Sequence, residues 1–364
     1  MNALDSYIVK DEMKPHVLEC FETGFVSHFE YPLPEPWGSV ENYEPLLSKK
    51  GREMLQRAMS KQVEEGKMIG GPGWTAEMVR NFFGGQNFYG IPCGVTEKDG
   101  DPFGRIVHDY GFYKRGGYSI NATHSSTSVK YLTFLERASI LQNVQWYIKA
   151  DLASGFRQFG THPVDWRMQV YCNGPHEHYI DLACPFGKTN SPLEVCPPVS
   201  LFARSAAMRY AEEMNCGAPV LGSHVDDIFG GFLLCNSYEK ACHFRAYLCR
   251  IGELLTIEFN RKPTKTPLPS KRQIILGCLW NSVDRRVRTS EKKKRKYLAR
   301  IMNLLSRDNA SVKEILQIHG NLNYAAEVIP FGRPFLAPLS NLTVEHEQKD
   351  MVNICPLSKM GLRV

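Results

Sequence analysis

The sequence lacks the features that mark membrane-spanning and secreted proteins. No apolar run among its 364 residues approaches the roughly 18 residues that a membrane helix needs. Its first residues do not follow the basic and then apolar pattern of a secretory signal. The eleven cysteines are dispersed and include no Cys-x-x-Cys pair. We therefore expect reduced thiols, a nuclear or cytoplasmic location and no membrane partner.

Internal repeats and low-complexity linkers are also missing. The 43% hydrophobic and 23% charged residues are typical of a soluble protein, and the length allows two or three compact units. The net charge of +6 is unevenly spread, because residues 285–300 hold nine Lys or Arg and one acid, Glu291. This density suits a phosphate backbone. A solvated helix face or a nuclear-import signal is the alternative explanation.

Hydrophobic periodicity and turn residues predict an alternation of helices and strands in the middle of the chain. We expect helices over 48–66, 129–143, 198–215 and 238–255, strands over 146–150 and 274–280, a hairpin over 165–183, and a turn at 70–73. With a second hairpin around Asp226, the order is strand, hairpin, helix, hairpin, helix, strand. This order indicates an α+β fold with a split βαβ sheet.

Two adjacent acids, Asp226 and Asp227, lie between two apolar runs. Like charges on a tight hairpin repel each other, so stability does not explain them, whereas a divalent cation would. The split sheet would bring Asp151, at the end of the 146–150 strand, beside the pair. Three carboxylates suit a hard cation, so we expect two Mg²⁺ (or Mn²⁺) ions. Taken alone, Asp151 is equally explained as a helix cap.

Several short motifs occur in the order and near the spacing of the reverse transcriptases. Asp151 to Phe156 has the D-x4-aromatic form of that family's palm, and His224 to Asp227 resembles its Y-x-D-D hairpin. Further matches resemble the family in residues 105–109, 119–121, 185–192, 265–277, 320–324 and 328–336, and in the earlier segment 65–72. The last three resemble the tyrosine-recombinase (DIRS-type) retrotransposons. The resemblance covers roughly residues 55–340.

The resemblance implies a right-hand polymerase with fingers, palm and thumb and a ferredoxin-like split βαβ palm. Residues 1–60 would form an N-terminal extension, 61–145 the fingers, 146–284 the palm with finger insertions, and 285–364 the thumb and C-terminal helices. The activity implied is that of a nucleotidyltransferase, an RNA-directed DNA polymerase that extends a primer with dNTPs by two-metal phosphoryl transfer. Its partners would be an RNA or DNA template with primer. The family's RNase H region has no counterpart here, so a separate RNase H is a candidate partner.

The resemblance also implies a role for each matched residue. The metal ligands would be Asp151, Asp226 and Asp227, and Lys265 would protonate the leaving pyrophosphate. The triphosphate would contact Lys98 and Arg105, the sugar Phe156, and the approaching substrates Phe186 and Gly187. The nucleic acid would contact His224, Gly277, Lys293, Lys294 and Arg295.

Two residues depart from the family pattern. His224 stands where Tyr or Phe is usual, and Cys184 replaces Leu before the Pro-Phe-Gly segment. Single residues also have plainer explanations, since Lys98 and Lys265 could be solvated and Phe156 could belong to the core. RNA-directed RNA synthesis is a second polymerase hypothesis, against which Phe156 argues. A hypothesis of another class is a non-catalytic descendant that binds nucleic acid or serves in assembly.

Overall fold

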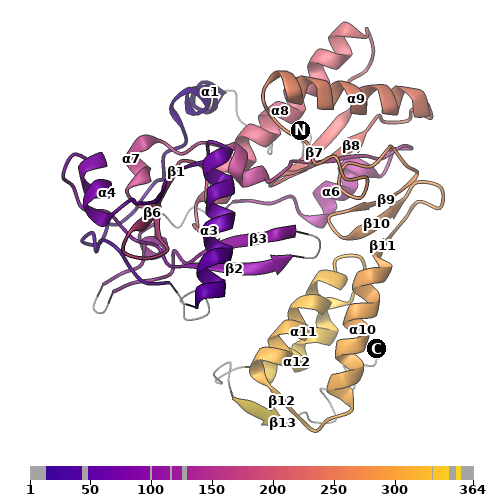
Figure 1. Cartoon of the computed structure of the whole chain (residues 1–364). Coiled ribbons are helices and arrows are strands. Elements are labelled where there is room, and N and C mark those ends of the chain that lie inside the picture. Colours follow the sequence, from indigo (N-terminus) through magenta and orange to yellow (C-terminus); the bar gives the residue numbers. More distant parts are fainter. Residues whose placement is uncertain are drawn as a thin grey trace. The chain divides into compact units, whose positions relative to one another are not determined.

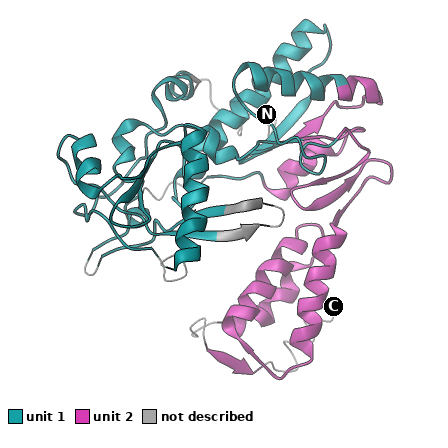
Figure 2. Cartoon of the chain, viewed as in Figure 1, with its two compact units in different colours: residues 1–132, 150–228, 243–267 teal, residues 133–149, 229–242, 268–364 magenta. Residues whose placement is uncertain are grey.

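The computed structural model of the protein describes residues 14–42, 48–98, 101–114, 117–124, 129–329, 331–343 and 350–353. The chain forms two compact units, coloured separately in Figure 2. The first unit comprises residues 1–132, 150–228 and 243–267, and the second comprises 133–149, 229–242 and 268–364. Among the described helices, none is long and apolar enough to cross a membrane.

Many of the helices and strands labelled in Figure 1 belong to the first unit. Its helices are α1 (Lys14–Thr23), α3 (Lys49–Glu64), α4 (Ala76–Phe82), α5 (Ile120–Thr123), the 3₁₀ helix η3 (Gly155–Gln158), α7 (Pro163–Trp166) and α8 (Ser191–Glu213). Its strands are β1 (Met68–Pro72), β2 (Cys93–Lys98), β3 (Asp101–His108), β5 (Val170–Cys172), β6 (Glu177–Asp181) and β7 (Val220–His224).

Three elements contain a boundary between the units, and the remainder belong to the second unit. The shared elements are β4 (Ile148–Asp151), β8 (Asp227–Gly231) and α9 (Tyr238–Leu254). The second unit adds the helices α6 (Phe134–Leu141), α10 (Glu291–Leu305), α11 (Val312–Ala325), η4 (Arg333–Leu336) and α12 (Ala337–Asn341). Its strands are β9 (Arg272–Ile275), β10 (Cys278–Asn281), β11 (Arg286–Thr289), β12 (Asn309–Ser311) and β13 (Met351–Asn353).

The sheet that positions the two aspartates has the strand order β4-β8-β7. Strand β8 therefore lies next to β4, and the backbone N–H of Leu152 donates to the carbonyl of Asp226 at 3.0 Å. The predicted placement of the β4 end beside the Asp226 hairpin is confirmed. Helix α8 packs against β7, and it begins at Ser191, earlier than expected, with Pro197 and Pro198 inside it.

The hairpin expected over 165–183 does not join this sheet. The hairpin β5–β6 is present, but it pairs with β1 in the order β1-β6-β5. Residues 70–73 were expected to turn, yet Gly70 and Gly71 lie within β1. A Cβ atom on Gly70 would overlap the carbonyl oxygen of His178, and the φ of Gly70 is +104°. Glycine therefore lets β1 approach β6 in a conformation that other residues rarely adopt.

The strand expected over 274–280 is two strands, β9 and β10, joined by a tight turn. Leu276 and Gly277 both have positive φ, at +48° and +79°. These left-handed residues reverse the chain, so β9 and β10 pair antiparallel with Ile275 opposite Cys278. Residues 285–364, which were expected to form the thumb and C-terminal helices, also contain the strands β11, β12 and β13.

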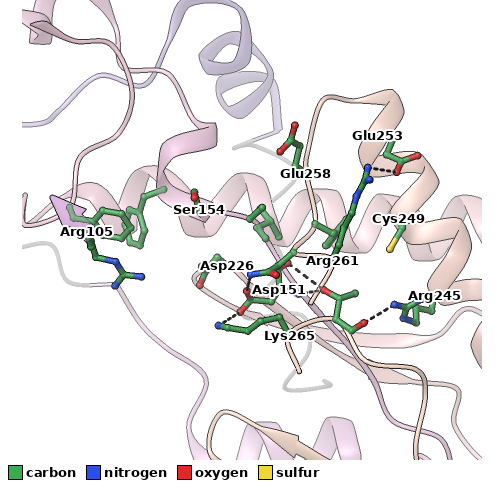
Figure 3. Close-up of a pocket in the computed structure, with 18 residues that line it drawn as sticks. Arg105, Asp151, Ser154, Asp226, Arg245, Cys249, Glu253, Glu258, Arg261 and Lys265 are labelled. Carbon is green, nitrogen blue, oxygen red and sulfur yellow. Dashed lines mark hydrogen bonds and ion pairs between the residues drawn. The ribbon is translucent and has the colours of Figure 1, made fainter. Parts of the chain in front are cut away.

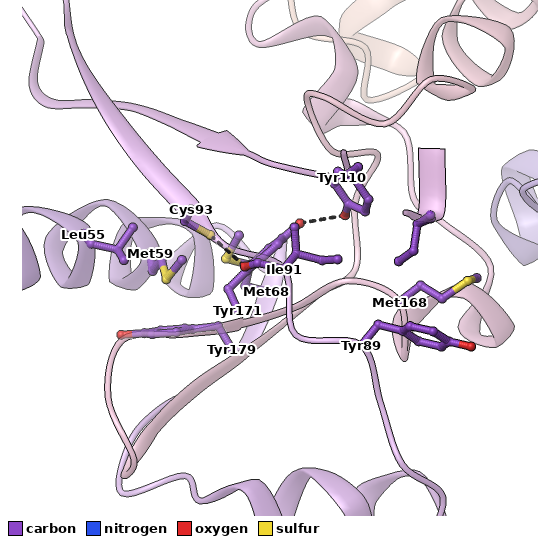
Figure 4. Packing of buried hydrophobic residues seen from close by; sticks show 11 residues of the cluster. Leu55, Met59, Met68, Tyr89, Ile91, Cys93, Tyr110, Met168, Tyr171 and Tyr179 are labelled. Carbon is purple, nitrogen blue, oxygen red and sulfur yellow. Dashed lines mark hydrogen bonds between the residues drawn. The ribbon is translucent and has the colours of Figure 1, made fainter. Parts of the chain in front are cut away.

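Each unit has its own apolar core. Figure 4 shows that of the first unit, where Met59 of α3 and Met68 of β1 pack with buried tyrosines. The Tyr110 and Tyr171 hydroxyls lie 3.0 Å apart, and Tyr171 also donates to Asp181 at 3.1 Å. In the second unit the core packs around residues of α10, α11 and α12. The buried hydroxyls of Tyr110 and Tyr171 thus have hydrogen-bond partners.

Candidate active site

A cavity of about 820 Å³ in the first unit collects six of the fourteen residues singled out from the sequence (Figure 3). Its lining comes from segments that lie far apart in the chain. The lining residues are Arg105, residues 151–156, Phe186, Asp226, Arg245, Cys249, Glu253, residues 258–261, Lys265 and Thr266. Asp151, Asp226 and Lys265 lie together, with Arg105 to one side and Arg261 to the other.

Asp151 is held from several directions. Its side chain is 7% exposed, and Lys265 Nζ lies 3.0 Å from its Oδ1. The Asn260 amide donates to its Oδ2 at 3.5 Å, and its own backbone N–H donates to the Thr266 hydroxyl at 3.2 Å. Arg245 in turn donates to the carbonyls of Thr266 and Pro267 at 2.6 and 2.7 Å. Asp151 and Lys265 therefore have fixed positions at the cavity wall.

The hairpin between β7 and β8 turns at Val225 and Asp226. Val225 has a φ of +56°, which is costly for a β-branched residue. Asp226 faces the cavity, and Asp227 opens β8. Burial, and then repulsion from Asp151, raises the pKa of Asp226. For Lys265, burial lowers the pKa, but the hydrogen bond to Asp151 and attraction to the three aspartates outweigh it, so the net pKa is raised.

The three carboxylates do not form a ready metal cluster. Among the residues that the structure describes, no group of three or more His, Cys, Asp or Glu side chains is arranged to hold an ion. The donors at the cavity are nevertheless carboxylate oxygens, which Mg²⁺ and Mn²⁺ prefer. The repulsion that raises the pKa of Asp226 is the kind that a bound cation relieves. Metal binding by Asp151, Asp226 and Asp227 stays a prediction.

The Gly155 backbone allows η3 to approach Asp226. A Cβ atom at Gly155 would lie 2.9 Å from Oδ2 of Asp226 and 3.0 Å from its Cγ. These distances are well inside ordinary van der Waals contact. Only glycine leaves room for the carboxylate at this point, a contact that the sequence analysis did not anticipate.

Two aromatic rings and a guanidinium form another part of the cavity. The rings of Phe156 and Phe186 are 5.0 Å apart, and the Arg105 guanidinium lies 5.2 Å from the centre of the Phe186 ring. All three residues line the same cavity. Phe156 is half-buried, so it is not an ordinary core residue.

The loop that carries Phe186 is fixed by the motifs that precede it in sequence. Gly187 has a φ of +95°, and a Cβ there would overlap the His108 carbonyl. The His108 Nδ1–H donates to the Phe186 carbonyl at 3.2 Å, and Asn121 donates to the Gly187 carbonyl at 2.9 Å. Burial lowers the pKa of His108 to about 4, so its ring is neutral at pH 7.

Cys184 lies just before this loop and is fully buried. Its thiol contacts a carboxylate oxygen of Glu194 at 3.3 Å. Burial, and then the negative charge of Glu194, raises the pKa of Cys184 well above its ordinary value. The ten cysteines within the described residues are free thiols.

The remaining site predictions fall elsewhere. His224 packs on Tyr131, with ring centres 4.6 Å apart. Lys98 ends β2, but its side chain lies outside the described residues. In the second unit, Lys294 and Arg295 are exposed on α10.

Lys293 and Gly277 have an internal arrangement within the second unit. Lys293 Nζ lies 3.7 Å from the centre of the Tyr324 ring, and a Cβ on Gly277 would lie 2.7 Å from Lys293 Cε. Burial lowers the pKa of Lys293. The Tyr324 hydroxyl also donates to the Leu276 carbonyl. Lys293 therefore packs on the turn at Gly277 and differs from its exposed neighbours.

Sequence reasoning missed the part of the cavity wall formed by α9 and the segment after it. This part is lined by Arg245, Cys249, Glu253, Glu258 and Arg261. Their helical or loop surroundings carry no motif, so only the folded chain brings them to Asp151. For Gly155 a signal existed, since it lies inside the D-x4-aromatic motif.

No protein-family model matches the chain, and no curated protein matches its sequence. Among solved structures it resembles the foamy viral protease-reverse transcriptase in three complexes, each at 16% identity over 100% of this chain. The TM-scores are 0.64 and 0.57 for two complexes with double-stranded DNA and 0.60 for one with an RNA/DNA hybrid. The chain spans 56%, 67% and 43% of those three chains, respectively. The chain has a reverse-transcriptase-like fold.

Proposed function

We propose that this chain is an RNA-directed DNA polymerase that extends a nucleic-acid primer with deoxynucleoside triphosphates. One observation carries the proposal. A single cavity brings the carboxylates of Asp151 and Asp226 and the ammonium of Lys265 together with Arg105 and Phe156. A site for a nucleoside triphosphate needs acids for cations, bases for phosphates and a flat surface for the sugar.

Each of these groups has a task that its surroundings support. Arg105 offers a fork of N–H donors to the phosphate oxygens. The half-buried ring of Phe156 lines the cavity, and in this proposal it would crowd a ribose 2′-hydroxyl and so favour deoxynucleotides. Lys265 is protonated at neutral pH, as lysines ordinarily are, and its pKa is raised further, so it would carry the proton that the leaving pyrophosphate requires.

Asp151 and Asp226, with Asp227, would hold two Mg²⁺ or Mn²⁺ ions. When bound, such ions activate an attacking oxygen and stabilise a leaving one in phosphoryl transfer. Asp151 is at present paired with Lys265, so ion binding and the Lys265 contact compete for one carboxylate. The finer assignment to the DIRS-type group, and the division into fingers, palm and thumb, belong to the same proposal.

The nucleic acid would lie along the basic run of the second unit. Lys294 and Arg295 expose their cations on α10. Such side chains neutralise backbone phosphates without reading the sequence. Lys293 is only partly exposed and packs on Tyr324, so it would contribute less to this surface. The proposed partners are thus an RNA or DNA template with primer, with a separate RNase H where the template must be removed.

Primer extension tests the proposal. Purified protein with Mg²⁺ or Mn²⁺ should extend oligo(dT) on poly(rA) with dTTP. Asp226→Asn should abolish extension and leave duplex binding nearly intact. Glu212→Gln is the matched control, since Glu212 is exposed on α8 and away from the cavity, and it should behave as wild type.

Three results would contradict this proposal. Extension by Asp226→Asn at the wild-type rate would remove the site from the reaction. Preference for UTP over dTTP would favour RNA synthesis. An inert wild-type chain that still binds duplex, with both metals and over a range of salt, would favour a non-catalytic binding or assembly module.

A further inference from the structure

Next to Phe156, a buried arginine makes a two-pronged ion pair. Both Nη atoms of Arg157 lie 2.7 Å from the carboxylate oxygens of Asp181. Arg157 is 6% exposed and Asp181 is 0% exposed. A planar guanidinium fixes such a pair in one geometry, which an ammonium cannot do.

The same guanidinium reaches the strand that leads to Phe186. Its Nη1 also donates to the carbonyls of Ala183 and Cys184 at 3.1 and 3.4 Å. Its Nε donates to the Gln62 side chain at 3.0 Å. The backbone N–H of Cys184 donates to the Phe159 carbonyl at 2.8 Å. Arg157 therefore ties η3, which carries Phe156, to the residues immediately before Phe186.

These hydrogen bonds of Arg157 bear on the distance between the rings of Phe156 and Phe186. Phe156 precedes Arg157 directly, and Phe186 follows Cys184 by two residues. Their rings are 5.0 Å apart at the cavity wall. If either backbone segment moved, the Phe156 ring would shift relative to Phe186, and the space that the cavity leaves for a sugar beside Phe156 would change.

We infer that Arg157 is a positioning residue that sets the preference for deoxynucleotides over ribonucleotides, by fixing Phe156 relative to Phe186. The inference rests on the proposed function. Arg157 itself does not touch the nucleotide in this proposal, since its donors are occupied by Asp181, Gln62 and the two carbonyls. It acts through the ring beside it.

The experiment compares Arg157→Lys with a matched substitution in the second unit. Lys keeps the charge beside Asp181 but loses the fork. Arg137→Lys is the control, because Arg137 is also buried and paired, with Glu327 at 2.6 Å, and does not line the cavity. The readout is the efficiency of dTTP incorporation divided by that of UTP, with kcat and KM determined separately.

In Arg157→Lys the ratio of dTTP to UTP incorporation efficiency should fall at least about tenfold. The main cause should be that UTP becomes a better substrate, because the pocket no longer rejects the 2′-hydroxyl. In Arg137→Lys the ratio should be unchanged. Phe156→Val removes the ring, so the double variant with Arg157→Lys should have the ratio of Phe156→Val alone. Equal losses for dTTP and UTP, or additive effects in the double variant, would overturn the inference.

Two further measurements keep the outcome decisive. Gln62→Ala removes only the partner of Arg157 Nε and should lower the dTTP/UTP ratio by a smaller factor than Arg157→Lys. This variant tests the inference if Arg157→Lys does not fold. Direct binding of dTTP and UTP to the chain with template and primer separates the inference from the proposed function. An inert chain that prefers dTTP, and loses this preference in Arg157→Lys, supports the inference alone. A folded wild-type chain that binds both nucleotides equally overturns it.

Discussion

Gly155→Ala should displace the β7–β8 hairpin, which carries Asp226, without changing any charge. The added Cβ would lie 2.9 Å from Asp226 Oδ2, where ordinary contact needs roughly 3.5 Å. Overpacking of this kind costs about 1–3 kcal/mol. The loss of glycine's freedom in the unfolded chain offsets about 0.4–1 kcal/mol of that cost. We expect a net loss of about 1–2 kcal/mol in the free energy of unfolding.

The effect on the reaction should exceed the effect on stability. A misplacement of about 1 Å can lower a rate by about 100-fold. The assays are urea denaturation and single-turnover primer extension on the same preparation. Gly217→Ala is the matched control, because Gly217 is exposed and a Cβ there meets nothing within 4 Å. It should extend primers at the wild-type rate and keep its stability within about 0.5 kcal/mol.

Two results would refute the reasoning. If Gly155→Ala loses stability but extends primers at the wild-type rate, the position of Asp226 does not matter to the reaction. If both stability and rate are unchanged, η3 and the hairpin are not packed as closely as the contact distances require.

Four more outcomes are expected. Since the pKa of His108 falls from 6.5 to about 4 on folding, its contribution is present above pH 6.5 and is lost as pH falls towards 4. In His108→Phe, the decline of unfolding free energy between pH 7 and pH 4, followed in urea, should therefore be smaller by up to about 3 kcal/mol; an unchanged decline would contradict this. Replacement by Ala of the exposed Lys294, Arg295 and Lys296 should weaken the salt dependence of duplex binding, measured by anisotropy. The slope of log K against log salt concentration should fall in magnitude by up to about 3. Lys293→Ala should instead lower thermal stability and leave that slope nearly unchanged. Gly320→Ala on the exposed side of α11, where a Cβ meets nothing within 4 Å, should stabilise the protein by about 0.5–1 kcal/mol in the same denaturation assay.

The meeting of Asp151 with the Asp226 hairpin could be predicted because it depends on strand order alone. Alternating apolar runs and glycines locate the strands, and their order along the chain then limits which ends can meet. The fold seen in the solved structures agrees with this prediction at the level of a reverse-transcriptase-like arrangement. The site could be located because its acids lie at strand ends.

The sequence predictions that were wrong or incomplete depended on the backbone conformation of single residues and on contacts between segments far apart in the chain. Gly70 looked like a turn residue because glycine favours turns, but here it allows β1 to pair with β6. Leu276 looked like part of one strand, although its left-handed φ reverses the chain. Arg157 and Arg245 carry no local pattern at all. Each donates hydrogen bonds to a carbonyl of another segment, Arg157 to that of Ala183 and Arg245 to that of Thr266, and only the folded chain shows these contacts.

Buried Cys184 gives the Phe186 loop a chemical reporter. Its thiol is fully covered and its pKa is raised, so almost no reactive thiolate reaches a labelling reagent while the loop is closed. The rate at which a thiol reagent modifies Cys184 in the native protein therefore measures how often this segment opens. Dividing that rate by the rate in the unfolded chain gives the equilibrium population of the open loop. The buried thiol thus allows the open population of the loop beside the cavity to be followed without any ligand.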